Sequence, residues 1–181
     1  MKIITFNSPI IKTWKLILIF ISLTFTISCK KPDREVMLSV KSYIALLKAN
    51  KYDSLDLSAF TYQDIPVLLK YRNETQIISN FPRNGISSLS APKCNLGMYV
   101  LWTIESIRAV SINQAYLIKR FPSQNPILAL RASNTLITIN SHTSHPHASK
   151  AYFDWWENNK QKDYNEFKYV DPLKSTDYKW H

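Results

Sequence analysis

The chain has 181 residues, of which 23 are Lys or Arg, 13 are Asp or Glu and only two are Gly, and its formal net charge is +10. This length indicates one main domain, and 45% apolar residues are enough to fill its core. So few Gly exclude Gly-rich phosphate-binding loops and disfavour a β-sandwich with many tight turns. The composition therefore favours a helical protein.

Residues 1–28 have the pattern of an export signal. The apolar run Leu16–Ile27 follows a basic segment and is shorter than the roughly 20 residues that a membrane-spanning helix needs. It leads into Ser28-Cys29, and together these residues resemble the cleavage site of bacterial lipoproteins, where the Cys is acylated and becomes the mature N-terminus. An ordinary signal peptide with an incidental Cys29 is the alternative.

The resemblance implies that Cys29 carries lipid chains such as palmitate, which hold the protein on a membrane. We therefore expect a lipid-anchored protein of the cell envelope, in the outer membrane, with the periplasmic or surface face left open. Residues 29–34 would form a tether and residues 35–181 a single helical domain. Cys94 is then the remaining thiol, and we expect it to pack as a small buried hydrophobe.

The first predicted helix begins after Asp33 as its N-cap, runs to about Ala49 and is ended by Asn50. Its apolar positions fall on one face of a helix, and they are Val36, Val40, Tyr43, Ile44 and Leu47. A short helix that opens at Thr61 or Asp64 follows, and Glu74–Asn80 forms another.

The longest predicted helix is Leu96–Asn113, with Asn95 as its N-cap. It is apolar on nearly every side, which indicates a central, buried helix. Two further helices are expected at Asn125–Arg131 and Ser149–Lys160. The β-branched segment Thr135–Asn140 is interpreted as irregular or helical, because a strand there has no obvious partner.

These elements predict an all-α fold, a compact multi-helix domain followed by an aromatic-rich C-terminal tail. Ile77–Pro82 and Leu117–Pro122 share an apolar pair, two polar residues and Phe-Pro, at a spacing that suits two HEAT-like helical hairpins. The alternative is that Phe-Pro is simply a common way to end a helix.

Basic residues dominate the middle of the chain, where Glu105 is the one acidic residue between positions 75 and 153. Arg108, Arg120 and Arg131 are candidates for binding an acidic ligand, unless these bases are scattered over the surface. The export signal argues against nucleic acid as the partner. Glu105 and Arg108 lie on one side of the long helix, where they form either a catalytic carboxylate site or, as we favour, an intrahelical salt bridge.

Two aromatic residues near the C-terminus, Trp155 and Trp156, are candidates for stacking on a sugar, although their helical spacing favours the core. His142, His145 and His147 could ligate a metal, but their Ser- and Thr-rich setting favours an exposed loop. No cofactor is expected.

The sequence therefore predicts a lipid-anchored binding or interaction module whose partner is an acidic ligand, a sugar or an envelope protein. The alternative is an envelope hydrolase acting on glycan or peptide, with Glu105 or the Asp154/Glu157 pair as catalytic groups. The ending AYFDWWENNK, followed by DPL and YKWH, resembles small uncharacterised helical lipoproteins of Gram-negative bacteria. That resemblance covers Arg34–His181 and implies no activity.

Overall fold

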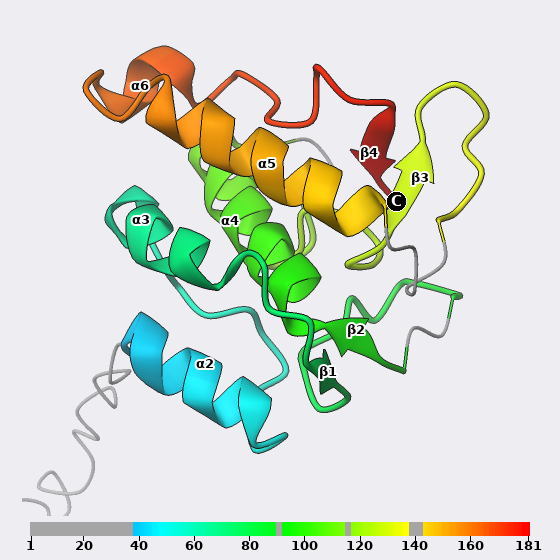
Figure 1. Ribbon diagram of the computed structural model, residues 1–181. Helices are drawn as coiled ribbons and strands as arrows, with labels where there is room; N and C mark the ends of the chain where they lie inside the picture. The colour runs from blue at the N-terminus through cyan, green and yellow to red at the C-terminus, as the bar shows by residue number, and fades with distance from the viewer. Residues whose placement is uncertain (1–37, 90–91, 115–116, 138–142) are drawn as a thin grey trace, which may run out of the picture. The chain divides into compact units, whose positions relative to one another are not determined.

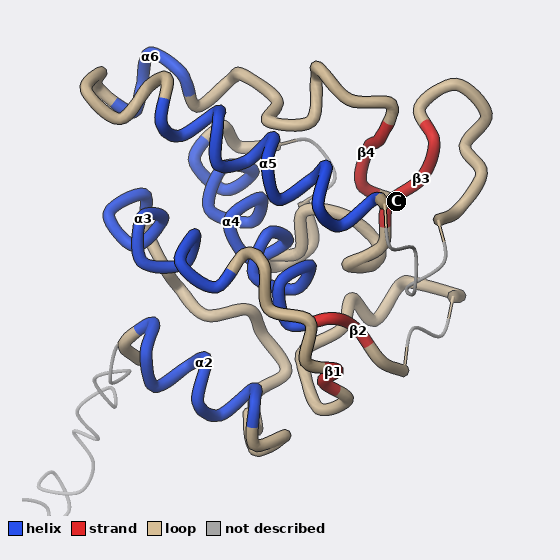
Figure 2. The backbone as a smooth tube through the Cα atoms, viewed as in Figure 1, coloured by secondary structure: helices blue, strands red, loops and turns tan. Residues whose placement is uncertain are grey.

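The computed structural model describes residues 38–89, 92–114, 117–137 and 143–181 (Figure 1). Five α-helices and four short strands occur within these ranges (Figure 2). In chain order they are α2 (Val40–Lys48), α3 (Ile65–Leu68), β1 (Ile77–Ile78), β2 (Cys94–Asn95), α4 (Leu96–Ser111), β3 (Leu128–Leu130), α5 (Ser144–Glu157), α6 (Tyr164–Phe167) and β4 (Tyr178–Trp180).

The prediction of an all-α fold is wrong, because two small antiparallel sheets of two strands each accompany the helices. In the first, β1 pairs with β2, with Ile78 opposite Cys94. In the second, β3 pairs with β4, with Leu128 opposite Trp180. The second sheet therefore joins the middle of the chain to its C-terminal end, and the fold mixes helices with strands.

Helix α4 forms the centre of the core, and α3 and α5 pack against it (Figure 1). Every residue from Leu96 to Ala109 is buried, as the apolar pattern predicts. The first N–H groups of α4 donate to the backbone of the segment before β1: Leu96 N to Gln76 O at 2.8 Å and Gly97 N to Glu74 O at 2.8 Å. Because these groups have no partner within a helix, the segment before β1 supplies the cap that the Asn95 side chain does not.

Gly97 is required by close packing rather than by its backbone angles. A Cβ atom there would lie 2.5 Å from Arg72 O and 2.5 Å from His145 Nε2. The absence of a side chain at Gly97 therefore allows the start of α4 to approach both neighbours.

Asparagine takes the left-handed positions that glycine usually fills at the ends of helices. Asn50 follows α2 with φ 54° and Asn113 follows α4 with φ 48°. After each, a backbone N–H returns to the last turn: Lys51 N to Leu46 O at 2.8 Å, and Gln114 N to Ala109 O at 3.0 Å. This is the Schellman pattern. The helices can therefore end in the usual way although the chain has only two Gly.

Several predicted helices are strands or turns instead. Ile77–Ile78 lies in β1 rather than in a helix, and Ile118 forms an isolated bridge with Phe121. The two HEAT-like hairpins are therefore a wrong prediction. Residues 125–131 contain β3, and the described part of the segment that begins at Thr135 runs beside it, since Ile137 N donates to Leu128 O at 2.8 Å.

Two helix starts also differ from the predictions. Ser39, not Asp33, caps α2, because its backbone is extended and its Oγ accepts from Ser42 N at 3.2 Å. Helix α5 begins at Ser144 and so includes Pro146 in its first turn, where proline is tolerated. Asp33 itself lies outside the described residues.

The aromatic-rich C-terminal tail, for which no helix or strand was predicted, contains α6 and β4. Asp163 and Glu166 form a capping box at the start of α6, with Asp163 Oδ1 accepting from Asn165 N at 2.8 Å. Phe167 is buried, whereas Tyr169 is exposed. The tail is therefore attached to the core by selected aromatic residues.

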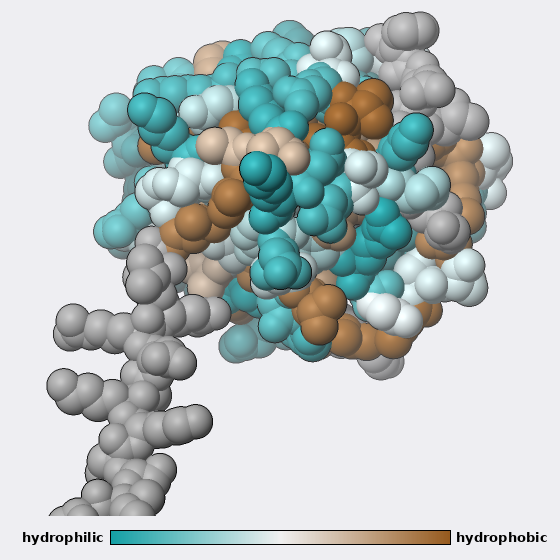
Figure 3. All heavy atoms as spheres, turned by 90° about the horizontal axis from the view of Figure 1, so that it is seen from below, coloured by the Kyte–Doolittle hydropathy of each residue, from teal (hydrophilic) through white to brown (hydrophobic). Residues whose placement is uncertain are grey.

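On the face shown in Figure 3, hydrophobic residues form small groups between hydrophilic ones. Among the described helices, none is both long and apolar enough to cross a membrane.

Candidate functional site

An open cleft of about 430 Å³ lies between the segment that precedes α3, the last turns of α4 and the region of α6. These elements lie on one side of the molecule in Figure 1. Its lining residues are Ala59, Phe60, Thr61, Tyr62, Ile107, Val110, Ser111, Arg120, Asp163, Tyr164, Asn165 and Lys168. We call this site the tyrosine cleft, and its volume is in the range of about 300–1,000 Å³ that is typical of small-ligand sites.

Two stacked tyrosines give the cleft its name. The rings of Tyr62 and Tyr164 are nearly parallel, with centroids 5.1 Å apart and an angle of 10° between their planes. Tyr164 is buried, and burial is the main cause of its raised pKa, whereas Tyr62 is 45% exposed. The Ser111 and Tyr164 hydroxyls form a hydrogen bond of 3.4 Å. The pair is thus a supported aromatic wall with one accessible ring.

Two basic side chains contribute positive charge to the cleft. Arg120 Nη2 donates to Phe60 O at 3.0 Å, and the Arg120 carbonyl accepts a hydrogen bond from Ser106 Oγ of α4. Lys168 Nζ donates to Asn165 Oδ1 at 2.9 Å. The one acidic residue of the lining, Asp163, is engaged in capping α6. The lining therefore has a net positive charge.

A buried polar network lies in the core close to this cleft. Arg108 donates to both carboxylate oxygens of Glu105, with Nε 3.2 Å and 3.1 Å from them. Tyr152 Oη donates to Glu105 Oε2 at 2.7 Å and accepts from Trp180 Nε1 at 2.7 Å. Arg108 Nη1 also donates to Lys168 O at 3.3 Å. The network thus connects α4, α5, β4 and a residue of the cleft lining.

The electrostatics of the network stabilise its ionised pair. Burial alone lowers the pKa of Arg108, but the hydrogen bonds and charge of Glu105 more than compensate and raise it. Burial, together with the charge of Glu105, raises the pKa of Tyr152 well above its usual value, so its hydroxyl remains a donor. Donors from two side chains hold the Glu105 carboxylate, which supports the interpretation of Glu105 and Arg108 as a structural salt bridge.

The structure separates the other candidate residues. Trp155 is buried against Phe167, with ring centroids 5.2 Å apart, while Trp156 beside it is half-buried. Arg131 pairs with Asp171 at 3.1 Å and donates to the Tyr178 carbonyl at 2.9 Å. Of the basic candidates, Arg120 alone lines the tyrosine cleft.

The histidines are also separated in role. His145 is buried and bonds through Nε2 to Arg72 O at 2.8 Å, and burial lowers its pKa. His147 is exposed, with its ring centroid 6.2 Å from that of Tyr178, and His142 lies outside the described residues. Within the described ranges, no group of three or more His, Cys, Asp or Glu is placed to hold a metal ion.

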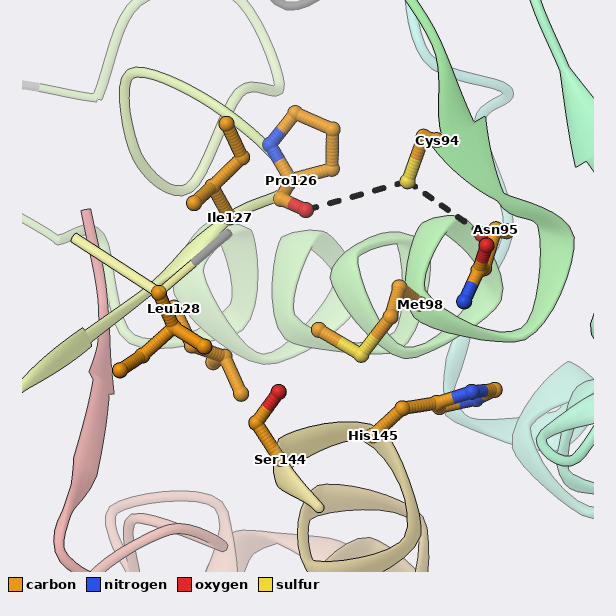
Figure 4. Close-up of a pocket in the computed structure, with 9 residues that line it drawn as sticks. Cys94, Asn95, Met98, Pro126, Ile127, Leu128, Ser144 and His145 are labelled. Atoms are coloured by element: carbon orange, nitrogen blue, oxygen red, sulfur yellow. Dashed lines mark hydrogen bonds between the residues drawn. The ribbon is translucent and has the colours of Figure 1, made fainter. Parts of the chain in front are cut away.

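A much smaller pocket of about 20 Å³ adjoins Cys94 and His145 (Figure 4). The Cys94 thiol bonds to two backbone carbonyl oxygens, those of Asn95 and Pro126, at 3.3 Å and 3.8 Å. Burial raises the pKa of Cys94 to about 12, so the thiol remains protonated at neutral pH. This confirms Cys94 as a buried residue, and the arrangement does not activate a nucleophile.

A third groove, of about 380 Å³, contains His147, Lys150, Asp154 and Asp177 among its lining residues. Lys150 and Asp154 form an exposed ion pair with each other, and Glu157 pairs with Lys160 at 2.6 Å. The two acids of the predicted hydrolase pair, Asp154 and Glu157, are therefore each engaged with a lysine.

Sequence reasoning missed most of the tyrosine cleft. Tyr62, Ser111 and Lys168 have no local pattern that marks them as ligand-binding residues. The spacing of Asp163 and Glu166 is that of a capping box and would have indicated α6.

Residues 35–181 match the model of a protein family described as a domain of unknown function, DUF4943. The match covers most of the chain, so the protein belongs to this family. No match was found among curated proteins or among solved structures.

Proposed function

We propose that this member of the DUF4943 family is a lipid-anchored binding module of the cell envelope and that the tyrosine cleft is its ligand-binding site. The observation that carries the proposal is the composition of the cleft. An accessible aromatic ring, two basic groups and several hydroxyls converge from segments that are distant in the sequence. Concave sites with an aromatic wall and a few polar groups are typical of small-ligand binding.

The geometry favours binding over the hydrolase alternative. Glu105 is only 5% exposed, and its carboxylate accepts hydrogen bonds from Arg108 and Tyr152. A general acid must reach the substrate within hydrogen-bond distance. Glu105 is instead a structural element close to the cleft.

The anchoring part of the proposal rests on the resemblance of the segment that ends at Cys29 to lipoprotein signals. When the full chain is expressed in a Gram-negative host, it should partition into the detergent phase. Cys29→Ser should release the protein or leave it unprocessed. A mature wild-type protein that stays in the aqueous phase would refute anchoring.

The binding part is tested by photo-crosslinking. A photoreactive amino acid at Tyr62 in the full chain should capture a molecule of the envelope. The same amino acid at Leu55, which is 82% exposed and outside the lining, is the matched control. Equal capture from both positions would contradict the assignment of the cleft.

A further inference from the structure

We infer that the tyrosine cleft binds an anionic saccharide, a sugar ring that carries a carboxylate or a phosphate. This inference rests on the proposed function and names the ligand class of the same site. It depends on three features of the lining: the accessible face of Tyr62, the basic groups and the hydroxyls beside them.

The aromatic wall suits a ring-shaped ligand. Tyr62 stacks on Tyr164 through one face, and Tyr164 is in turn fixed by Phe167, whose ring makes an angle of 87° with it at 5.3 Å. Tyr62 is therefore held in position although 45% of it is exposed. A preorganised ring of this kind binds the flat apolar face of a sugar with little loss of side-chain freedom.

The charge of the lining suits an anion. Lys168 forms no ion pair with any carboxylate in the described ranges. Its ammonium group donates to the neutral Asn165 amide and lies 5.3 Å from the ring centroid of Tyr169. An ammonium group has three donors, so Lys168 can also bind a ligand anion. Arg120 adds a second positive charge from another segment, and its guanidinium is oriented by Phe60 O.

Hydroxyl groups complete the site. Ser111 and Tyr164 lie together in the lining. Ser111 Oγ donates its proton to Arg108 O at 2.7 Å, so it offers a sugar hydroxyl an acceptor, whereas the Tyr164 hydroxyl can also donate. Burial raises the pKa of Tyr164, so its hydroxyl keeps its proton. A neutral aromatic wall, basic groups and protonated hydroxyls together favour a sugar with an acidic substituent over a neutral one.

The chain offers a matched control for Lys168. Lys162 Nζ donates to Asn159 Oδ1 at 2.9 Å, three residues earlier, as Lys168 Nζ does to Asn165 Oδ1. Lys162 is exposed and does not line the cleft. Lys162→Met therefore removes the same charge and the same local hydrogen bond without changing the site.

The experiment is calorimetric titration of the full chain, purified in detergent. The carboxylate probe is tetragalacturonate, and its neutral counterpart is the methyl ester. The phosphate probe is glucose 6-phosphate, and its neutral counterpart is glucose. We expect at least one acidic probe to bind roughly tenfold or more tightly than its neutral counterpart, because a charge-assisted hydrogen bond is lost with the charge. Which probe prevails distinguishes the two sources of the anion.

The variants then locate the binding. Lys168→Met should remove most of the preference for the acidic probe, whereas Lys162→Met should leave it unchanged. Tyr62→Ala should weaken acidic and neutral probes alike. Circular dichroism of each variant verifies that it remains folded.

Three outcomes would overturn the inference. If acidic and neutral probes bind equally, or if Lys168→Met and Lys162→Met behave alike, the charge of the cleft does not select the ligand. If no probe binds, the assignment of a saccharide as the ligand is wrong. Crosslinking from Tyr62 then tells whether the cleft binds another ligand or none. Specific capture of an envelope protein from Tyr62 would leave the proposed binding function standing. If Tyr62 captured nothing, the proposed binding function would be refuted as well.

Discussion

The buried pair of Glu105 and Arg108 permits a sharp test of the core. In the variant Arg108→Met, the Glu105 carboxylate loses its cationic partner and keeps the Tyr152 hydroxyl as a donor. The side chains of the pair are 6% and 11% exposed for Glu105 and Arg108, so water cannot readily replace the guanidinium. Removing one partner of a buried ion pair typically costs about 3–5 kcal/mol.

The matched control is the exposed pair Lys150 and Asp154, which lies on α5 with its side chains 75% and 46% exposed. Lys150→Met should cost no more than about 0.5 kcal/mol, as for other exposed pairs four residues apart on a helix.

The assay is urea unfolding of the full chain, with Cys29→Ser as the common background. Tryptophan fluorescence and circular dichroism both monitor the transition. The two signals should coincide if unfolding is two-state, and the midpoint then reports the free energy of unfolding. Arg108→Met should lower the midpoint clearly, and Lys150→Met should not. Equal midpoints for the two variants would refute the view that Glu105 depends on Arg108 in the core.

Three further predictions concern the core. Trp155→Ala should reduce the free energy of unfolding by about 3–5 kcal/mol, and Trp156→Ala by clearly less, because Trp155 is buried and Trp156 is half-buried. Urea melts that rank the two variants the other way would contradict the core assignment. Burial lowers the pKa of His145 from 6.5, so at acidic pH this imidazole binds a proton more readily in the unfolded chain than in the folded one. The free energy of unfolding should therefore fall as the pH drops through about 6.5. Melts of His145→Gln across pH 5–8 should lack this contribution. Cys94 should resist a thiol reagent in the folded protein and react on unfolding, since burial raises its pKa to about 12; fast labelling of the native protein would show that the thiol is accessible.

Helix α4 could be predicted from the sequence because its signal is local. Between Leu96 and Val110 the apolar residues fall on nearly every side of a helix, which indicates a helix that is buried all round. The structure places it at Leu96–Ser111, two residues shorter than predicted. The first helix was found in the same way from Val40 to Leu47.

The strands could not be predicted because their partners are remote and their runs are short. Ile77 pairs with Asn95, and Leu128 pairs with Trp180 near the C-terminus. Two or three residues are too few to show an alternating pattern, so the pairing depends on tertiary contacts. The inference from low Gly content to an all-helical chain failed for a related reason. Lys119, in the turn between Ile118 and Phe121, and Asn134, in the turn after β3, take the left-handed conformation without glycine.

The candidate site was predicted only in part. Arg120 was singled out for its charge, and it lines the cleft; Arg131 was singled out on the same ground, and it holds the C-terminal segment instead. Charge alone does not separate these roles, because an arginine binds ligand anions and backbone carbonyl oxygens with the same donors. Tyr62 and Lys168 become a site only when α6 is placed beside α4.

The contact between the buried network and the cleft suggests why an ion pair lies in this core. A buried pair contributes little net stability over an apolar substitute, but it can fix the position of what it contacts. Here Arg108 Nη1 binds the Lys168 carbonyl, so the salt bridge orients a residue of the cleft wall. The double variant Glu105→Gln and Arg108→Met removes both charges and keeps an acceptor for Tyr152, so it should recover more than half of the stability lost in Arg108→Met. Hydrogen exchange of the backbone around Lys168 should nevertheless stay faster than in the unmodified chain, and the preference for acidic saccharides should stay reduced. If the backbone around Lys168 exchanged hydrogen as slowly in the double variant as in the unmodified chain, the network would serve stability alone. The position of Lys168 would then be set by α6.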